Sequence, residues 1–232
     1  MERIAQFFDP PSSTLTYVLF DDETREAALV DGVDRQIERD LGFIATENLE
    51  LKWVLETHVH ADHITSAAEV ARRTRARTAA PASCDVPVAS KQLLDGMSLP
   101  LGEGRIHVLH TPGHTAGSMC YRWGDAILTG DTLFIGGCGR TDFQGGSADK
   151  LWHSVTGKLF ALPDDIRVLP GHDYNGKRES TIGHEKRTNP RLAGKSLEEF
   201  RAIMAGLNLP KPKLIDIAVP ANRALGAARH DA

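Results

Sequence analysis

The stretch Thr57-His58-Val59-His60-Ala61-Asp62-His63 places three imidazoles and one carboxylate within six consecutive residues. The residues before it, 52–56, are predicted to form a strand, and those after it, 64–71, a helix. Side chains alternate along an extended segment, so we expect His58 and His60 to point the same way, with Asp62 and His63 at the turn into the helix. Neutral imidazoles and ionised carboxylates bind borderline divalent metals. A solvated polar turn is the plain alternative, but this spacing favours a metal site.

Three later turns carry further candidate ligands, each just past a predicted strand. His114 lies between Gly113 and Gly117, Asp131 follows Gly130, and His172 follows Gly171. Taken singly, each residue is typical of an ordinary turn or loop. Their joint occurrence with the histidine stretch indicates that seven ligand-type side chains meet at one site, namely His58, His60, Asp62, His63, His114, Asp131 and His172.

The composition predicts a globular protein with a sizeable core and excludes several classes of function. The chain has 232 residues, of which 41% are hydrophobic, and a net charge of −4. This charge does not favour nucleic-acid binding, and no stretch is apolar enough for a signal peptide or a membrane span. Three cysteines without a Cys-x-x-Cys pair indicate a reducing compartment, so we expect a cytoplasmic protein.

Hydrophobic periodicity predicts strands followed by helices, twice over. The expected strands are 13–20, 26–30, 52–56, 77–81, 105–110, 118–123, 125–129 and 166–169, and the expected helices are 33–45, 63–75, 148–162 and 196–207. Residues 84–104 are expected to be loop-like, and the tail after Pro210 to be a docked or loose extension. This order predicts an α/β (α+β) protein with two sheets rather than one parallel sheet.

The combined motifs resemble the metallo-β-lactamase superfamily over about residues 14–190. The resemblance implies a four-layer αββα sandwich with metal in a cleft at one edge of the two sheets. It also implies a catalytic domain at 1–195, with 196–232 as a C-terminal helix and tail packed on or extending from it. True β-lactamases carry a Cys where this chain has Asp131, so that activity is not expected.

Two branches of the superfamily fit the residues. The chain resembles glyoxalase II at 130–134 and 137–140, which predicts, as the alternative, a dinuclear hydroxyacylglutathione hydrolase. It resembles the persulfide dioxygenases (sulfur dioxygenases) more closely, in Phe8-Asp9-Pro10, in 137–144, in Gly171-His172-Asp173-Tyr174 and in Asn189-Pro190-Arg191-Leu192. Glyoxalase II usually departs from this chain at 141–143.

The persulfide dioxygenase resemblance implies one Fe(II) per chain, held by His58, His114 and Asp131, with zinc conceivable in a purified or alternative form. His60, Asp62, His63 and His172 would then orient the ligands, whereas in glyoxalase II they complete a second metal position. All seven are present, so the ligands alone do not choose between one metal and two. The implied partners are glutathione persulfide and O₂, giving sulfite and glutathione, with a homodimer as the assembly to test.

The substrate carboxylate requires a cation. Arg140, in a glycine-rich loop near Asp131, is the first candidate, and Tyr174 and Arg191 are weaker ones. The alternative for Arg140 is a surface salt bridge. Cys138 is a candidate redox thiol, although a small buried residue is the more common role of a free cysteine.

Overall fold

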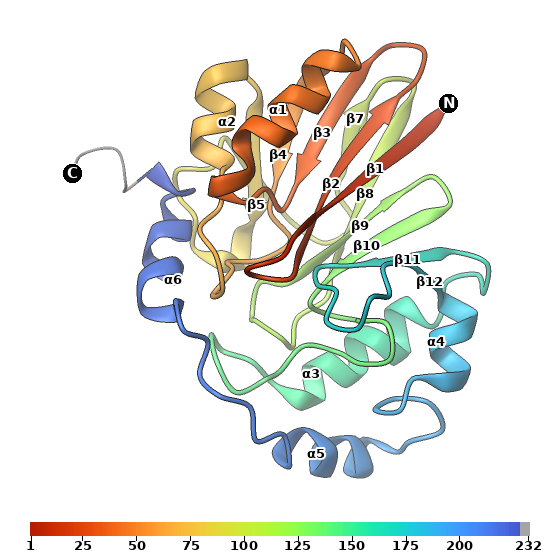
Figure 1. Cartoon of the computed structure of the whole chain (residues 1–232). Helices are drawn as coiled ribbons and strands as arrows, with labels where there is room; N and C mark the ends of the chain where they lie inside the picture. The colour runs from red at the N-terminus through yellow and green to blue at the C-terminus, as the bar shows by residue number, and fades with distance from the viewer. Residues whose placement is uncertain (228–232) are drawn as a thin grey trace.

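The computed structural model describes residues 1–227 and contains two six-stranded sheets, packed face to face, with helices on both outer surfaces (Figure 1). The first sheet has the order β1 (Glu2–Asp9), β2 (Thr14–Asp21), β3 (Glu26–Val30), β4 (Glu50–Leu55), β5 (Arg77–Pro81) and β6 (Lys91–Leu93). The second has the order β12 (Ser180–Thr181), β11 (Arg167–Pro170), β10 (Ala126–Gly130), β9 (Met119–Trp123), β8 (Gly104–His110) and β7 (Ser98–Leu101). The helices are α1 (Ile37–Thr46), α2 (Ala67–Thr74), α3 (Ala148–His153), α4 (Ile182–Thr188), α5 (Leu197–Ala205) and α6 (Ile215–Arg223).

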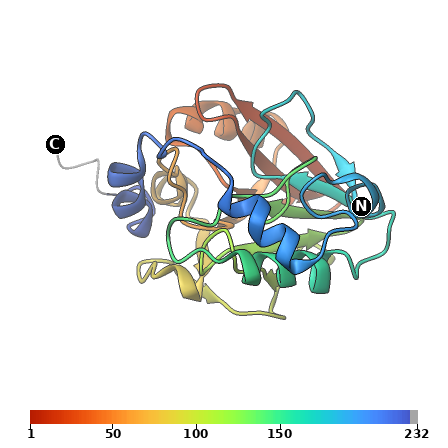
Figure 2. The same cartoon turned by 90° about the horizontal axis from the view of Figure 1, so that it is seen from below.

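The central strands are buried on both faces because each has a layer on either side. In β2, Leu15, Tyr17 and Leu19 lie in the core between the two sheets, whereas Val18 packs in the cluster beneath α1 and α2. The helices α3 and α5 cover the outer face of the second sheet through a separate apolar cluster (Figure 2). These layers are the predicted αββα sandwich, so the predicted fold is confirmed.

Parallel pairing of strands places the candidate metal ligands at one edge of the sandwich. β3, β4, β5 and β6 are mutually parallel, as are β10 and β11, so the carboxyl ends of neighbouring strands meet at the same edge. Asp31 follows β3, His58 follows β4, and Asp131 follows β10. An isolated bridge between Thr14 and His172 joins the two sheets at this edge. The topology therefore collects the predicted ligands from both sheets.

Several predicted element boundaries were wrong. The helix expected from His63 begins only at Ala67, because residues 58–66 are held in an irregular loop by tertiary contacts. The loop-like stretch 84–104 contains the short strands β6 and β7, and β1, β12 and α4 were not predicted. The helix expected over 148–162 continues after α3 as a π-helical segment at 154–159.

The C-terminal segment is docked on the domain over its described length. The capping box of α5, formed by Ser196 and Glu199, starts a helix that packs beside α3, and α6 packs near the histidine loop. The last residues of the predicted tail, 228–232, lie outside the described residues. Among residues 1–227, no helix is both long enough and apolar enough to cross a membrane.

Candidate metal centre

The histidine loop, residues 57–66, follows β4 and contains neither helix nor strand. Its start is fixed by Asp31, whose carboxylate accepts hydrogen bonds from the backbone N–H of Thr57 (2.7 Å) and from its hydroxyl (2.8 Å). Asp31 is 1% exposed and has a left-handed φ of 52°, which Asp tolerates better than most residues. A buried carboxylate thus anchors the loop where regular secondary structure is absent.

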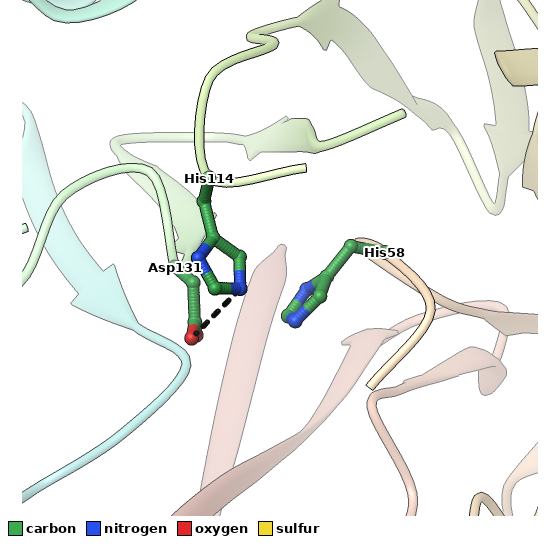
Figure 3. A group of neighbouring side chains, drawn as sticks. All are labelled: His58, His114 and Asp131. Carbon is green, nitrogen blue, oxygen red and sulfur yellow. Dashed lines mark ion pairs between the residues drawn. The ribbon is translucent and has the colours of Figure 1, made fainter. Parts of the chain in front are cut away.

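Three of the predicted ligands meet as one group. One nitrogen each of His58 and His114 and one oxygen of Asp131 lie within 4.8 Å of one another, and Figure 3 shows them directed at a common space. Nε2 of His114 is 3.4 Å from Oδ2 of Asp131. Nδ1 of His114 is 2.7 Å from the carbonyl oxygen of Arg140, which requires a proton on Nδ1 and leaves the lone pair of Nε2 for a metal. Burial, with the nearby His60 and His114, holds the pKa of His58 well below its usual range, so His58 is neutral as a ligand must be.

A second group lies beside the first. One ligand atom each of His60, Asp62 and His172 also fall within 4.8 Å of one another. Nε2 of His172 is 3.4 Å from Oδ1 of Asp131 and 3.9 Å from Oδ2 of Asp62, so Asp131 borders both groups. His63 is not a member of either group. Its Nδ1 lies 3.0 Å from Oδ2 of Asp62, where it orients that carboxylate.

His60 faces two carboxylates with its other nitrogen. Nε2 of His60 is 3.1 Å from Oδ1 of Asp31 and 3.4 Å from Oε2 of Glu56, and all three side chains are buried. Burial alone would lower the pKa of His60, but the two carboxylates outweigh it and raise that pKa well above its usual range. Nε2 of His60 therefore interacts with these carboxylates, and only Nδ1 remains available to the second group.

The residues of the centre fit a metal ion. Buried polar atoms are normally hydrogen-bonded, yet within 1–227 two of the side chains that form the groups carry a buried atom without a hydrogen-bond partner. These atoms are Nδ1 of His60 and Oδ1 of Asp131. A mixed imidazole and carboxylate donor set of this kind is suited to iron or zinc.

The backbone closes tightly around the first group at Gly139. A Cβ atom at this position would lie 2.8 Å from Nδ1 of His114 and would also meet the carbonyl oxygen of Asp131. Only glycine fits there without displacing a ligand. The glycine-rich loop seen in the sequence thus has a packing role beside the metal group.

A cavity of about 360 Å³ opens directly onto His114 and Asp131. Its other lining residues are Phe134, Cys138, Gly139, Arg140, Tyr174, Arg191, Leu209 and Pro210. The volume lies in the range of small-molecule sites. All four residues proposed from the sequence for substrate or redox roles therefore lie beside the first ligand group.

The two arginines of the cavity differ in how many of their N–H groups are already hydrogen-bonded. Arg140 is bound by both oxygens of Asp142 (2.7 Å each) and donates to the carbonyl of Pro210 (2.7 Å). Arg191 donates to the carbonyl of Cys138 (2.7 Å), and among residues 1–227 no carboxylate pairs with it. Arg191 therefore retains more of its hydrogen-bonding capacity for a ligand.

Tyr174 and Cys138 also line this cavity but differ in exposure. The ring of Tyr174 is stacked on His172 with centroids 5.3 Å apart, and 62% of the residue is exposed. Cys138 is 1% exposed, and burial raises the pKa of its thiol to about 11, which keeps it protonated at neutral pH.

Sequence reasoning missed part of the centre. Asp31 directly follows one predicted strand and Glu56 ends another, and acidic residues are ordinary at both places. Leu209 and Pro210 lie in a linker about 70 residues from Arg140. No local pattern marks these residues, because their roles arise from contacts distant in the sequence.

Comparison with known proteins gives a consistent result. The family model described as "Metallo-beta-lactamase superfamily" matches residues 9–86 and 79–172. The chain is 43% identical to human mitochondrial persulfide dioxygenase ETHE1 over 225 residues, covering 96% of this chain and 88% of that protein. The crystal structure of ETHE1 from Myxococcus xanthus is 50% identical, with a TM-score of 0.95 and coverage of 97% and 99%. TTHA1623 in a di-iron-bound form is 27% identical, with a TM-score of 0.70 and coverage of 81% and 100%.

Proposed function

The chain belongs to the metallo-beta-lactamase superfamily, and we propose that it is an iron-dependent persulfide dioxygenase acting on glutathione persulfide. His58, His114 and Asp131 support this proposal most directly, because their ligand atoms lie close together beside a cavity. The family supports the same reaction class, since relatives at 41–43% identity over most of the chain are named persulfide dioxygenases.

His58, His114 and Asp131 would hold one ferrous ion. When bound, such an ion would supply the activation of O₂ beside a sulfur substrate, which is the chemistry associated with a donor set of two imidazoles and one carboxylate. The carbonyl of Arg140 fixes the tautomer and the ring orientation of His114. Asp131 faces His114 with Oδ2 and His172 with Oδ1, at 3.4 Å each.

The proposed reaction balances as glutathione persulfide plus O₂ plus water giving glutathione plus sulfite, with release of protons. The terminal sulfur gives up four electrons, O₂ takes them up, and both oxygen atoms of O₂ form bonds to that sulfur. Water supplies the third oxygen as the sulfur–sulfur bond breaks, and the glutathione sulfur leaves as the thiol.

The cavity residues would bind the remainder of glutathione. A carboxylate is best recognised by a planar guanidinium with free N–H donors. Arg191 meets this condition because only one of its terminal nitrogens is used, by Cys138. Arg140 would act chiefly by holding Leu209 and Pro210 as a wall of the cavity. The exposed Tyr174 ring would cover the substrate on the side of His172.

A glyoxalase II-type hydrolase is the second candidate, and the group of His60, Asp62 and His172 is the observation that favours it. A di-iron-bound relative fits a second metal position as well. Against it, the relatives named persulfide dioxygenases are more similar to this chain, at 41–43% identity, than the di-iron-bound protein, at 27%.

Metal analysis and two substrates separate the candidates. Protein loaded anaerobically with Fe(II) should contain about one iron per chain and consume O₂ when glutathione persulfide is added. Two metals per chain with hydrolysis of S-D-lactoylglutathione, and no O₂ uptake, would establish the hydrolase instead.

The compartment proposed for this activity is the cytoplasm. The three cysteines are free and buried, which suits a reducing environment. The mammalian relatives are named as mitochondrial, so immunofluorescence or fractionation is the relevant test. The homodimer stays a prediction, to be tested by light scattering.

A further inference from the structure

The side chain of Asn222, in α6, is 3% exposed although it is polar. A buried amide destabilises a protein unless hydrogen bonds replace those to water. Asn222 meets this requirement through the histidine loop alone. Its Oδ1 accepts from the backbone N–H of Thr65 (2.9 Å), and its Nδ2 donates to the carbonyls of His60 (2.9 Å) and His63 (2.8 Å).

These three backbone groups belong to the part of the chain that lacks helix and strand. Buried backbone N–H and C=O groups require partners, and regular secondary structure supplies none between 58 and 66. One primary amide offers two donors and one acceptor, which matches the two carbonyls and one N–H. The carbonyls of His60 and His63 lie on either side of Asp62, so Asn222 fixes the backbone that presents this carboxylate.

The helix that carries Asn222 is itself attached to the loop and to α2. Ala218 and Ala221 pack with Ile64, and the carbonyl of Leu225 accepts from the N–H of Ala68. At Gly226, with φ of 79°, an added Cβ would collide with the carbonyl oxygen of Thr65. The position of Asn222 is therefore determined independently of its hydrogen bonds to the loop.

We propose that Asn222 is a positioning residue for the metal centre, acting through the backbone of the histidine loop. The amide links a helix near the C-terminal end to a site whose ligands lie at 58–172. Without it, two carbonyls and one N–H lose their partner, and the loop exchanges among conformations that no longer align His58 with His114 and Asp131. This inference rests on the metal ligands of the proposed function.

The test measures metal binding directly rather than turnover. Metal-free wild-type protein, Asn222→Asp and Asn222→Ser are titrated with Co²⁺ and followed by its visible absorption. Asn222→Asp keeps the shape of the side chain but replaces both donors by an oxygen that faces the carbonyls. Loss of a group that orients ligands typically weakens metal binding by about 10-fold to 100-fold. We expect this loss in both variants, and the larger loss in Asn222→Asp.

Phe200→Leu is the matched control, because Phe200 is fully buried in the apolar cluster beneath the second sheet, and that cluster contains no residue of the histidine loop or of α6. Circular dichroism gives the Tm of each metal-free variant. We expect Phe200→Leu to lower the Tm while binding Co²⁺ as tightly as wild type. Wild-type affinity in both Asn222 variants would overturn the inference, as would an equal loss of affinity in Phe200→Leu. If Asn222→Asp does not fold, the Co²⁺ affinity of Asn222→Ser alone tests the inference. If wild type itself binds no metal, the proposed function fails first.

Discussion

The contrast between the two cavity arginines leads to a specific prediction about substrate binding. Arg191 has one terminal nitrogen engaged, at 2.7 Å from the carbonyl of Cys138, whereas Arg140 is engaged by Asp142 and by the linker carbonyls. If Arg191 binds a glutathione carboxylate, Arg191→Ala removes a charge-assisted hydrogen bond worth about 1.5–3 kcal/mol. That loss corresponds to a decrease in kcat/KM of about 10-fold to 100-fold, expressed in KM with kcat little changed.

The assay is O₂ uptake with two substrates, glutathione persulfide and a persulfide of a small alkyl thiol that lacks a carboxylate. Arg191→Ala should lose kcat/KM only on glutathione persulfide. Arg140→Ala should raise KM for glutathione persulfide and also lose rate on the small substrate, because it releases the wall formed by Leu209 and Pro210. Arg187→Ala, on α4 and paired with Asp164, removes the same charge outside the cavity and should behave as wild type. An unchanged KM in Arg191→Ala, or an equal loss on both substrates, would refute the assignment.

Other predictions follow from burial and charge. Asp40 is fully buried, and burial raises its pKa from 3.8 to about 6, so the cost of ionising it in the folded state grows as pH rises from about 4 to about 6. Asp40→Asn should remove that dependence and, with at most about 3 kcal/mol available, raise the free energy of unfolding at pH 7.5 but not at pH 3.5. Urea melts at both pH values check this, and equal effects at the two would contradict it. Cys138→Ser should retain at least about half of the turnover, because a buried thiol whose pKa is about 11 stays protonated; loss of activity with unchanged iron content would instead support a redox role. Removing the metal with a chelator should lower the Tm by several degrees, since an ion bound only by the folded state stabilises it; calorimetry before and after adding Fe(II) back provides the measurement.

The sequence was sufficient for the parts of the protein whose structure is local or periodic. The strands at 26–30 and 77–81 could be placed from short runs of strand-forming residues that end at turn signals. The histidine stretch could be recognised from the spacing of its side chains alone. β6 and β7 could not, because strands of three and four residues carry too little pattern to stand out from a loop. β1 was missed because its charged and polar residues resemble an unstructured terminus, whereas pairing with β2 along its whole length decides its conformation.

At the site, too, the sequence could not predict features that depend on contacts between residues far apart in the chain. The candidate ligands could be named because histidine and aspartate in this spacing match a metal-binding pattern. The structure brings them together, and their binding of a metal stays a prediction. The start of α2 was misplaced by four residues because Asp31 and Asn222 hold residues 58–66 out of helical geometry. The sequence places Arg140 nearest to Asp131, but proximity in sequence does not reveal that Asp142 pairs with its guanidinium. Such competition between partners appears only in three dimensions. Which arginine binds the substrate stays a prediction.

The central claim is a single iron at the group of His58, His114 and Asp131. Its most direct test is elemental analysis of anaerobically loaded protein combined with O₂ uptake on glutathione persulfide, for wild type and for His114→Ala. About one iron per chain with one O₂ consumed per sulfite formed, and neither in the variant, is the predicted result. Two tightly bound metals per chain, or sulfite formation that persists without iron, would contradict it.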